Sequence, residues 1–155
     1  MKEKQILKEG KKIPDFTLKD QHNKEMRLSD LEGRKVLLSF HPLAWTSVCA
    51  QQMESLEANI KRFEELNTIA LGVSVDTIPS KHAWAKQLNI TKTRLLSDFW
   101  PHGDVAQKLG LFRKHEGFSE RANIIVDEEQ KIVFTKIYEI PQLPDIEEII
   151  HILKK

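Results

Sequence analysis

The feature that most constrains the fold of this chain is an alternation of strand-length apolar runs with a segment of helical periodicity. Residues 36–40 (VLLSF) form a continuous apolar run of strand length, and residues 69–75 form a second one. Between them, apolar residues recur at steps of four and three, as one buried helix face requires. These residues are Cys49, Met53, Leu56, Ile60 and Phe63. Two buried strands joined through a helix predict a parallel sheet with helices packed against it.

Two hairpins are predicted on either side of this alternation. Residues 15–18 and 25–28 flank a polar turn, and residues 122–126 and 131–138 flank a second turn at 127–130. Periodicity and capping residues predict helices over residues 46–66, 80–88, 104–109 and 145–153, and a short strand over 94–96. We therefore expect the α/β class: a thioredoxin-like sandwich with a mixed central sheet, helices on both faces and an N-terminal hairpin.

Length and charge narrow the possible functions. A chain of 155 residues is the usual size of one domain, so we expect a single domain over residues 1–155. The formal net charge of +1, from 24 basic and 23 acidic residues, argues against binding to nucleic acid or a membrane surface as the main activity. The basic start of the chain has no apolar stretch behind it, as a secretory signal would need, which favours a cytoplasmic location. Residues 1–12 are expected to form a solvated arm.

The chain has one cysteine, Cys49, so an internal disulfide, a CxxC redox pair and a multi-thiolate zinc site are excluded. We expect Cys49 in the first turn of a helix that follows the carboxyl end of a buried strand, where open α/β sheets place their sites. Unpaired backbone N–H groups there favour a thiolate. Taken alone, however, a lone cysteine is more often a small core residue.

A resemblance to a known family favours the reactive interpretation. The pattern Pro-x-x-x-Thr-x-x-Cys, formed by Pro42, Thr46 and Cys49, resembles the active-site motif of the peroxiredoxins, the AhpC/TSA family. Further blocks that resemble the family are residues 14–18 (PDFTL), 40–46 (FHPLAWT), 97–103 (SDFWPHG) and 121–127 (RANIIVD). The resemblance thus covers nearly the whole chain, and the branch it most resembles is the bacterial alkyl hydroperoxide reductase E type.

This resemblance implies a thiol-specific peroxidase that reduces hydrogen peroxide or organic hydroperoxides through a sulfenic acid on Cys49. It implies that Arg121 is the active-site arginine, that the Thr46 hydroxyl holds the attacked oxygen, and that Pro42 shapes the loop and shields the sulfur. It implies no cofactor, and the histidines show no metal-ligand spacing. It also implies a homodimer formed through loops near the site, which contain Trp45 and Trp100.

The positions where members of the family carry a second cysteine differ here. One of them is Glu54, and the C-terminal segment 149–155 contains no cysteine. The resemblance therefore points to the one-cysteine class, whose thiol is regenerated by an external reductant: a thioredoxin-like protein, a glutaredoxin-type system or a small thiol. Gln52 stands where the family often has Glu, and its role is left open, as is that of His41. The alternative function is a redox sensor or protein-binding module that uses Cys49 as a switch.

Overall fold

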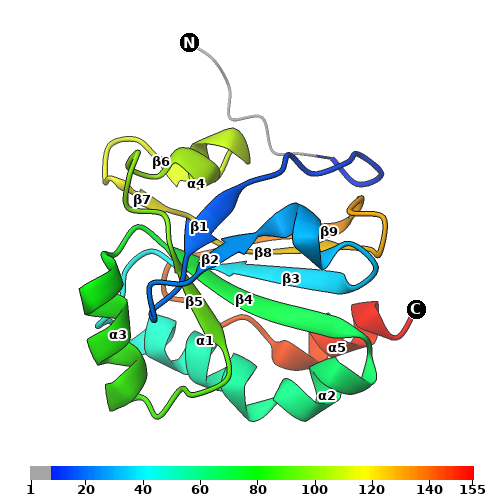
Figure 1. Ribbon diagram of the computed structural model, residues 1–155, viewed down its shortest axis with the longest axis horizontal. Coiled ribbons are helices and arrows are strands. Elements are labelled where there is room, and N and C mark those ends of the chain that lie inside the picture. The colour runs from blue at the N-terminus through cyan, green and yellow to red at the C-terminus, as the bar shows by residue number, and fades with distance from the viewer. Residues whose placement is uncertain (1–7) are drawn as a thin grey trace.

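The computed structural model describes residues 8–155, and its centre is one mixed sheet (Figure 1). The strands of this sheet are β1 (Thr17–Lys19), β2 (Glu25–Arg27), β3 (Lys35–Phe40), β4 (Thr68–Ser74), β5 (Arg94–Ser97), β8 (Arg121–Val126) and β9 (Ile132–Tyr138). Their order across the sheet is β2-β1-β5-β4-β3-β8-β9. The three central strands are parallel, while β1 and β8 pair antiparallel with β5 and β3. The mixed sheet and the N-terminal hairpin are therefore confirmed.

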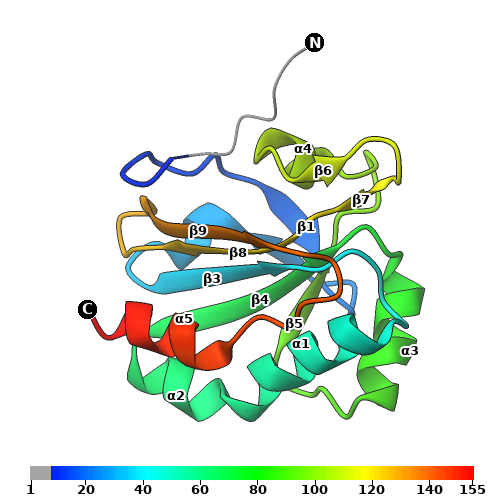
Figure 2. The ribbon, with the colours of Figure 1, turned by 180° about the vertical axis from the view of Figure 1, so that it is seen from behind.

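Helices cover the two faces of the sheet unequally. The helices are α1 (Ser47–Ala58), α2 (Ile60–Glu65), α3 (Ile78–Gln87), α4 (Asp104–Lys108) and α5 (Ile146–Leu153), with a 3-10 turn at Leu28–Leu31. Helices α1, α2, α3 and α5 lie on one face and α4 lies on the other, as Figures 1 and 2 show from opposite sides. This arrangement confirms the predicted thioredoxin-like sandwich.

Alternation along the central strands divides the core into two clusters. Val36, Leu38 and Phe40 of β3 pack on the α4 side together with the N-terminal segment. Leu37, between them, joins the cluster formed by α1, α2, α3 and α5. Successive side chains of a strand point to opposite faces, so one fully buried strand contributes to both clusters. Strand β3 is thereby fixed at the centre of the molecule, and the loop that follows it begins from a rigid base.

The predicted helix over 46–66 is divided in two at Asn59. The Asn59 side-chain amide donates to the Ser55 carbonyl over 2.7 Å, which is the acceptor that its own backbone N–H would use in a continuous helix. That N–H bonds the Leu56 carbonyl instead. A short polar side chain thus competes with the backbone and ends α1, although the apolar periodicity continues into α2.

Smaller differences also concern local hydrogen bonds. Helix α3 begins two residues before the predicted start, and its N-cap is Thr77, whose hydroxyl accepts from the Ser80 N–H. The hairpin of β6 (Phe112–Arg113) and β7 (Phe118–Ser119) was not predicted. Within the predicted solvated arm, Gly10 and Lys11 pair with Ile132 through backbone hydrogen bonds, so this part lies along the sheet edge. The remainder of that prediction, residues 1–7, lies outside the described part of the chain.

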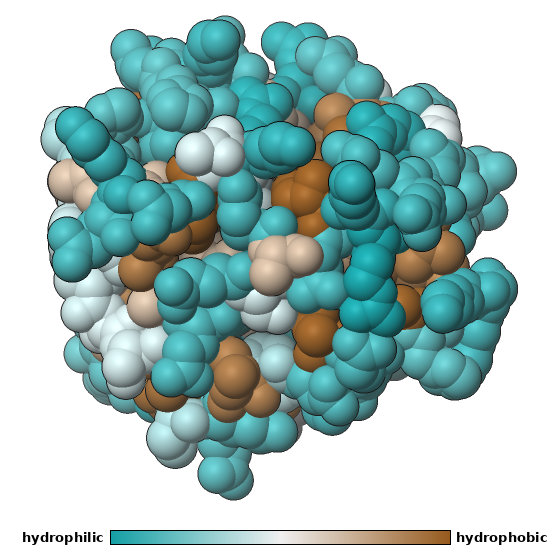
Figure 3. Space-filling model, turned by 90° about the horizontal axis from the view of Figure 1, so that it is seen from below, coloured by the Kyte–Doolittle hydropathy of each residue, from teal (hydrophilic) through white to brown (hydrophobic). Residues whose placement is uncertain are grey.

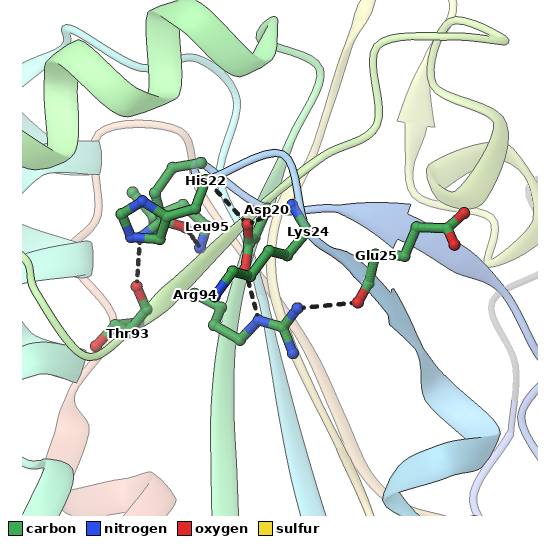
Figure 4. A network of polar contacts seen from close by, with 8 residues as sticks. Asp20, His22, Lys24, Glu25, Thr93, Arg94 and Leu95 are labelled. Carbon is green, nitrogen blue, oxygen red and sulfur yellow. Dashed lines mark hydrogen bonds and ion pairs between the residues drawn. The ribbon is translucent and has the colours of Figure 1, made fainter.

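Polar contacts fasten the turn of the N-terminal hairpin to β5, as Figure 4 shows. Asp20 accepts backbone N–H groups from His22 and Lys24 and also an Arg94 Nε–H bond over 2.8 Å. Arg94 in turn donates to the Glu25 carbonyl. Because the β1–β5 pairing is limited to one registered pair of residues, these contacts supply much of the attachment of the hairpin.

Over residues 8–155, none of the helices combines the length and apolar character that crossing a bilayer would require.

Candidate active site

The thiol of Cys49 lies near the junction between the end of strand β3 and the start of helix α1. Cys49 is the third residue of α1, and its side chain is buried, with 1% of its surface exposed. A loop of residues 41–46 connects the two elements. The first turn of a helix has free backbone N–H groups and the positive end of the helix dipole, so an anionic sulfur is stabilised there.

Arg121 reaches the sulfur from the neighbouring strand. It is the first residue of β8, and the antiparallel register pairs the next residue, Ala122, with Phe40 at the carboxyl end of β3. Arg121 Nη1 donates to Cys49 Sγ over 3.3 Å, and its Nε donates to the Ile140 carbonyl over 2.8 Å. The sheet thus brings together two predicted site residues that are 72 positions apart.

Gln52 fixes the guanidinium from the other side. It lies one turn after Cys49 on α1, and its Oε1 accepts from Arg121 Nη1 over 2.8 Å. Its amide Nε2 donates to Ser39 Oγ over 2.7 Å and to the Phe40 carbonyl over 3.1 Å. The amide therefore links the arginine to the end of β3, and this gives Gln52 the place in the site that the sequence had left open.

The charge on Arg121 is buried. Its residue surface is 2% exposed, and within residues 8–155 no carboxylate forms an ion pair with its guanidinium. A buried cation is costly unless an anion balances it. Cys49 is the neighbour within hydrogen-bond distance that can become an anion, so a thiolate there would balance the arginine.

The loop before Cys49 is anchored to the start of α3. The Ala44 N–H donates to Asp76 Oδ2 over 2.8 Å, and Trp45 Nε1 donates to Ser80 Oγ over 2.9 Å. Trp45 has a φ of 69°, a left-handed conformation that is rare for a bulky side chain. The two anchors hold the loop in this strained conformation.

The two other predicted site residues lie in this loop. Pro42 is buried two residues after the end of β3. Thr46 is the N-cap residue of α1, but its hydroxyl donates to the Leu43 carbonyl over 2.8 Å and makes no capping bond. Thr46 is exposed, so it lies on the solvent side of the site. With its proton committed to Leu43, the hydroxyl oxygen can still accept a further hydrogen bond.

His41 and Lys81 are buried near the same site. The His41 ring lies 5.5 Å from that of Trp84, and its Nε2 atom has no hydrogen-bond partner within residues 8–155. Burial, the charge of Lys81 and the charge of Arg121 hold the pKa of His41 well below 6.5, so the ring is neutral at pH 7. Its packing against Trp84 accords with the structural role that most buried histidines have.

Sequence reasoning missed Asp76, Ser80 and Lys81. Asp76 and Ser80 carry no pattern that would mark them, because their partners lie more than 30 residues away. Lys81, in contrast, could have been recognised from its spacing in the sequence. It precedes Trp84 and Ala85 at helical spacing, which places a lysine on the apolar face of α3.

Comparisons with known proteins agree with this geometry. The AhpC/TSA family model matches residues 10–135. Alkyl hydroperoxide reductase E of Mycobacterium tuberculosis is 38% identical over 141 residues, which cover 90% of this chain and 92% of that protein. A peroxiredoxin of Ignicoccus hospitalis is 31% identical over 151 residues, covering 94% of this chain and 64% of the relative. The crystal structure of reduced 2-Cys peroxiredoxin from Plasmodium vivax has a TM-score of 0.87 at 26% identity, covering 94% of this chain and 79% of that one.

Proposed function

The chain belongs to the AhpC/TSA family, the peroxiredoxins, and from this membership we propose that it reduces hydroperoxides at Cys49 by a one-cysteine mechanism. As a member of this family it is a thiol-dependent peroxidase. The proposal extends to hydrogen peroxide and organic hydroperoxides as substrates, to a sulfenic acid intermediate, and to the roles of the residues around the sulfur. Its main support is the buried contact of 3.3 Å between Arg121 Nη1 and Cys49 Sγ.

The first step is attack of the Cys49 thiolate on the terminal oxygen of the hydroperoxide. An S–O bond forms and the O–O bond breaks, so the sulfur loses two electrons that the peroxide gains. The departing alkoxide, or hydroxide in the case of hydrogen peroxide, takes up a proton and leaves as an alcohol or water. The product on the enzyme is a cysteine sulfenic acid.

Ionisation of the thiol does not by itself make a fast peroxidase. A free thiol of pKa about 8.5 is about 3% ionised at pH 7, and lowering that pKa to about 6 raises the fraction roughly thirtyfold. Intrinsic nucleophilicity falls by about ten- to eighteenfold over the same range, which leaves a gain of only about two- to threefold. The site must therefore also stabilise the charge that develops on the departing oxygen.

Two residues are suited to this second task. The guanidinium of Arg121 is held on two sides by Gln52 and the Ile140 carbonyl, so its position changes little as charge moves from sulfur to oxygen. The Thr46 hydroxyl oxygen can accept the peroxide proton and orient the attacked oxygen. Pro42 fills the space behind the loop and limits access of water to the sulfur.

The sulfenic acid is then reduced by thiols from outside the chain, because Cys49 is the single cysteine. One external thiol displaces water to form a mixed disulfide, and a second thiol releases Cys49 and leaves as a disulfide. A thioredoxin-like protein, a glutaredoxin-type system or a small thiol each fits this scheme. This need for reducing thiols supports the cytoplasm as the location of the protein.

Exposed aromatic side chains support a homodimer. Trp45 and Trp100 are 53% and 80% exposed, and Leu43 and Phe99 beside them in sequence are also exposed. Trp45 bonds Ser80, while Trp100 and Phe99 line a groove with Thr77, Ile78 and Pro79, so both groups flank the start of α3. The helix-covered face is mostly hydrophilic and carries several separate apolar patches (Figure 3).

Stopped-flow oxidation of the reduced protein tests the proposed function. Tryptophan fluorescence would follow the reaction with hydrogen peroxide and with an organic hydroperoxide, and the sulfenic acid would be trapped chemically. We expect a rate constant far above that of a free thiolate, turnover with an external thiol, and a loss of about 10²-fold or more in Arg121→Ala.

The control is Arg62→Ala, which removes a partly exposed arginine that pairs with Glu147 on the surface. It should react like the wild type. A wild-type rate equal to that of a free thiol would contradict the enzyme function, and a single reaction without turnover would favour the redox sensor. An Arg121→Ala rate within about threefold of wild type would contradict the role of the arginine.

A further inference from the structure

The described structure contains one lysine buried in the apolar core, Lys81 of α3. Its residue surface is 0% exposed, and its Nζ atom has no hydrogen-bond partner within residues 8–155. Lysine is almost never fully buried unless its charge is paired, because an ammonium loses its hydration on burial. The structure therefore calls for an anion that acts on this ammonium without a direct hydrogen bond.

The location of Lys81 is unfavourable for a second reason. It is the fourth residue of α3, so its positive charge lies in the first turn, near the positive end of the helix dipole. An apolar side chain of the same length, such as methionine, would fill the same space in the core without either cost. Stability thus gives no reason for a lysine at this position.

Cys49 packs in the same buried cluster as Trp84, which lies one turn after Lys81 on α3. Three groups that can carry a negative charge, each from a different element, act electrostatically on Lys81. They are Asp76 from the connection before α3, Cys49 from α1, and Asp98 from the connection after β5. The remaining titratable group that faces it is His41, at the end of β3, which is neutral at pH 7 and also lies within the influence of Arg121. No described hydrogen bond joins Lys81 to any of these groups.

Other donors already engage the two carboxylates. Asp76 Oδ2 accepts from the Ala44 N–H over 2.8 Å and from the Ser74 hydroxyl over 2.5 Å. The two oxygens of Asp98 accept the N–H groups of Val105 and Ala106, each over 3.0 Å. Burial raises the pKa of Asp98 to about 6, so this carboxyl is also largely ionised at pH 7. Cys49 is the remaining facing group, and its proposed reaction requires the charged form.

The protonation state of Lys81 is compatible with such a role. Burial lowers the pKa of Lys81 to about 8, although the charges of Asp76, Cys49 and Asp98 oppose this effect. Since a pKa near 8 lies above neutral pH, most molecules carry the ammonium at pH 7. The cation is therefore present under the conditions in which a peroxidatic thiolate has to form.

We propose that Lys81 is a positioning residue for the peroxidase reaction, whose buried ammonium acts together with Arg121 to stabilise the Cys49 thiolate. The inference rests on the proposed function, because it assigns Lys81 to the reactive form of Cys49. Arg121 contacts the sulfur directly, whereas Lys81 acts on it through the low-dielectric core. Two cations, from β8 and from α3, would then hold one anion.

The test compares Lys81→Met, Lys81→Arg and the control Lys86→Met, which removes an exposed lysine of the same helix. The midpoint of Cys49 ionisation is measured by thiolate absorbance near 240 nm in the reduced full-length proteins. We expect the Lys81→Met midpoint to rise by roughly one pH unit, which corresponds to about 1.4 kcal/mol. Lys86→Met and the charge-retaining Lys81→Arg should keep the wild-type midpoint.

The pH profile of peroxide oxidation separates an electrostatic role from a structural one. Below the midpoint, the rate constant of Lys81→Met should fall about threefold, since a tenfold lower thiolate fraction is partly offset by higher nucleophilicity. Above both midpoints it should equal the wild-type value or exceed it by up to about threefold. In urea unfolding, Lys81→Met should be at least as stable as wild type, because it removes a buried charge.

A Lys81→Met midpoint within about 0.3 pH unit of wild type would overturn the inference. So would an equal rise in Lys81→Arg, because the volume of the side chain rather than its charge would then be responsible. If Lys81→Arg does not fold, the comparison of Lys81→Met with Lys86→Met decides. A wild-type rate no faster than a free thiol would refute the proposed function instead, and the thiolate titration would still decide the role of Lys81.

Discussion

At the scale of single residues, the site depends on an uncharged side chain as well as on charged ones. Gln52 accepts a hydrogen bond from Arg121 and donates hydrogen bonds to the end of β3, so it holds the guanidinium in a fixed position relative to the sheet. A carboxylate at this position would compete with the sulfur for the positive charge. An amide holds the arginine in place and leaves that charge available to Cys49.

Replacing Gln52 tests this positioning. In Gln52→Leu the buried Arg121 loses an acceptor and Ser39 loses a donor, so we expect a loss of about 1–3 kcal/mol in unfolding free energy. The peroxide rate constant should fall about tenfold or more as the guanidinium moves away from the sulfur. Urea unfolding and stopped-flow oxidation measure the two effects.

The neighbouring variant Gln51→Leu provides the control. Gln51 lies on the exposed side of the same helix, so this change should leave both the stability and the rate close to wild type. Equal rates in Gln52→Leu and Gln51→Leu would contradict a role for Gln52 in placing the arginine.

A short motif predicted Cys49, Thr46 and Pro42 as site residues, and the resemblance to the family added the distant Arg121, whereas Lys81 and Asp76 were not predicted. Cys49, Thr46 and Pro42 lie within eight positions, and the contact between Cys49 and Arg121 follows once β8 pairs with β3. Lys81 and Asp76 depend on how α3 packs against the loop before Cys49. No local pattern encodes that packing, although a lysine on an apolar helix face indicated it.

At the scale of elements, hydrogen bonds from side chains to backbone groups determine how helices are attached to neighbouring turns and strands. Glu57 of α1 accepts N–H bonds from Thr91, Lys92 and Thr93, and hydroxyl bonds from Thr91 and Thr93. Burial would raise the pKa of Glu57, but these hydrogen bonds outweigh it and lower the pKa to about 2. One carboxylate thus attaches the turn before β5 to helix α1.

The hydrogen bonds that the Glu57 carboxylate accepts predict that the stability of the fold depends on pH. The pKa of Glu57 is depressed in the folded chain from an ordinary value of 4.5, so its contribution is complete above pH 4.5 and is lost as the pH falls towards 2. We expect Glu57→Gln to be less stable than wild type by about 1–2 kcal/mol at pH 7. The difference should shrink between pH 4.5 and pH 2.

Denaturant unfolding at several pH values measures this difference. Glu54→Gln, an exposed change on the same helix, should show no such narrowing. If the difference in unfolding free energy between wild type and Glu57→Gln stayed constant across the acid range, the carboxylate would not be the group that binds residues 91–93.

The elements themselves were largely predictable, whereas their ends were not. Apolar runs and helical periodicity gave the central strands, both main hairpins and the number of layers. The break at Asn59 and the cap at Thr77 each depend on one side chain that competes for a backbone group. The β6–β7 hairpin has only two residues in each strand, which is too short for alternation to show.

At the scale of the whole molecule, the proposed dimer places the interface beside the active-site loop. The exposed aromatic residues gather around the start of α3, close to the anchors of that loop. A partner that covers Trp45 would also hold its strained backbone conformation in place. Assembly and reactivity are therefore expected to change together.

A negative charge introduced among the exposed aromatic residues around the start of α3 should separate the subunits of the proposed dimer. We expect Trp100→Glu to sediment as an 18 kDa monomer at micromolar concentration, where the wild type sediments as a dimer. Val133→Glu places the same charge at an exposed apolar residue of β9 and should remain dimeric. A wild-type protein that sediments only as a monomer would contradict the dimer.

The contact between Cys49 and Arg121 also has a consequence for biosynthesis. The two residues are 72 positions apart, so a ribosome at about 5–20 residues per second makes the thiol roughly 4–14 s before its arginine. During that interval the nascent chain carries an ordinary cysteine, because β8 does not yet exist to bring the guanidinium to the sulfur. With Arg121 in its proposed role, the polypeptide acquires its full reactivity with peroxide only when synthesis has passed β8 and the sheet can close, so an incomplete chain should be oxidised no faster than an ordinary thiol.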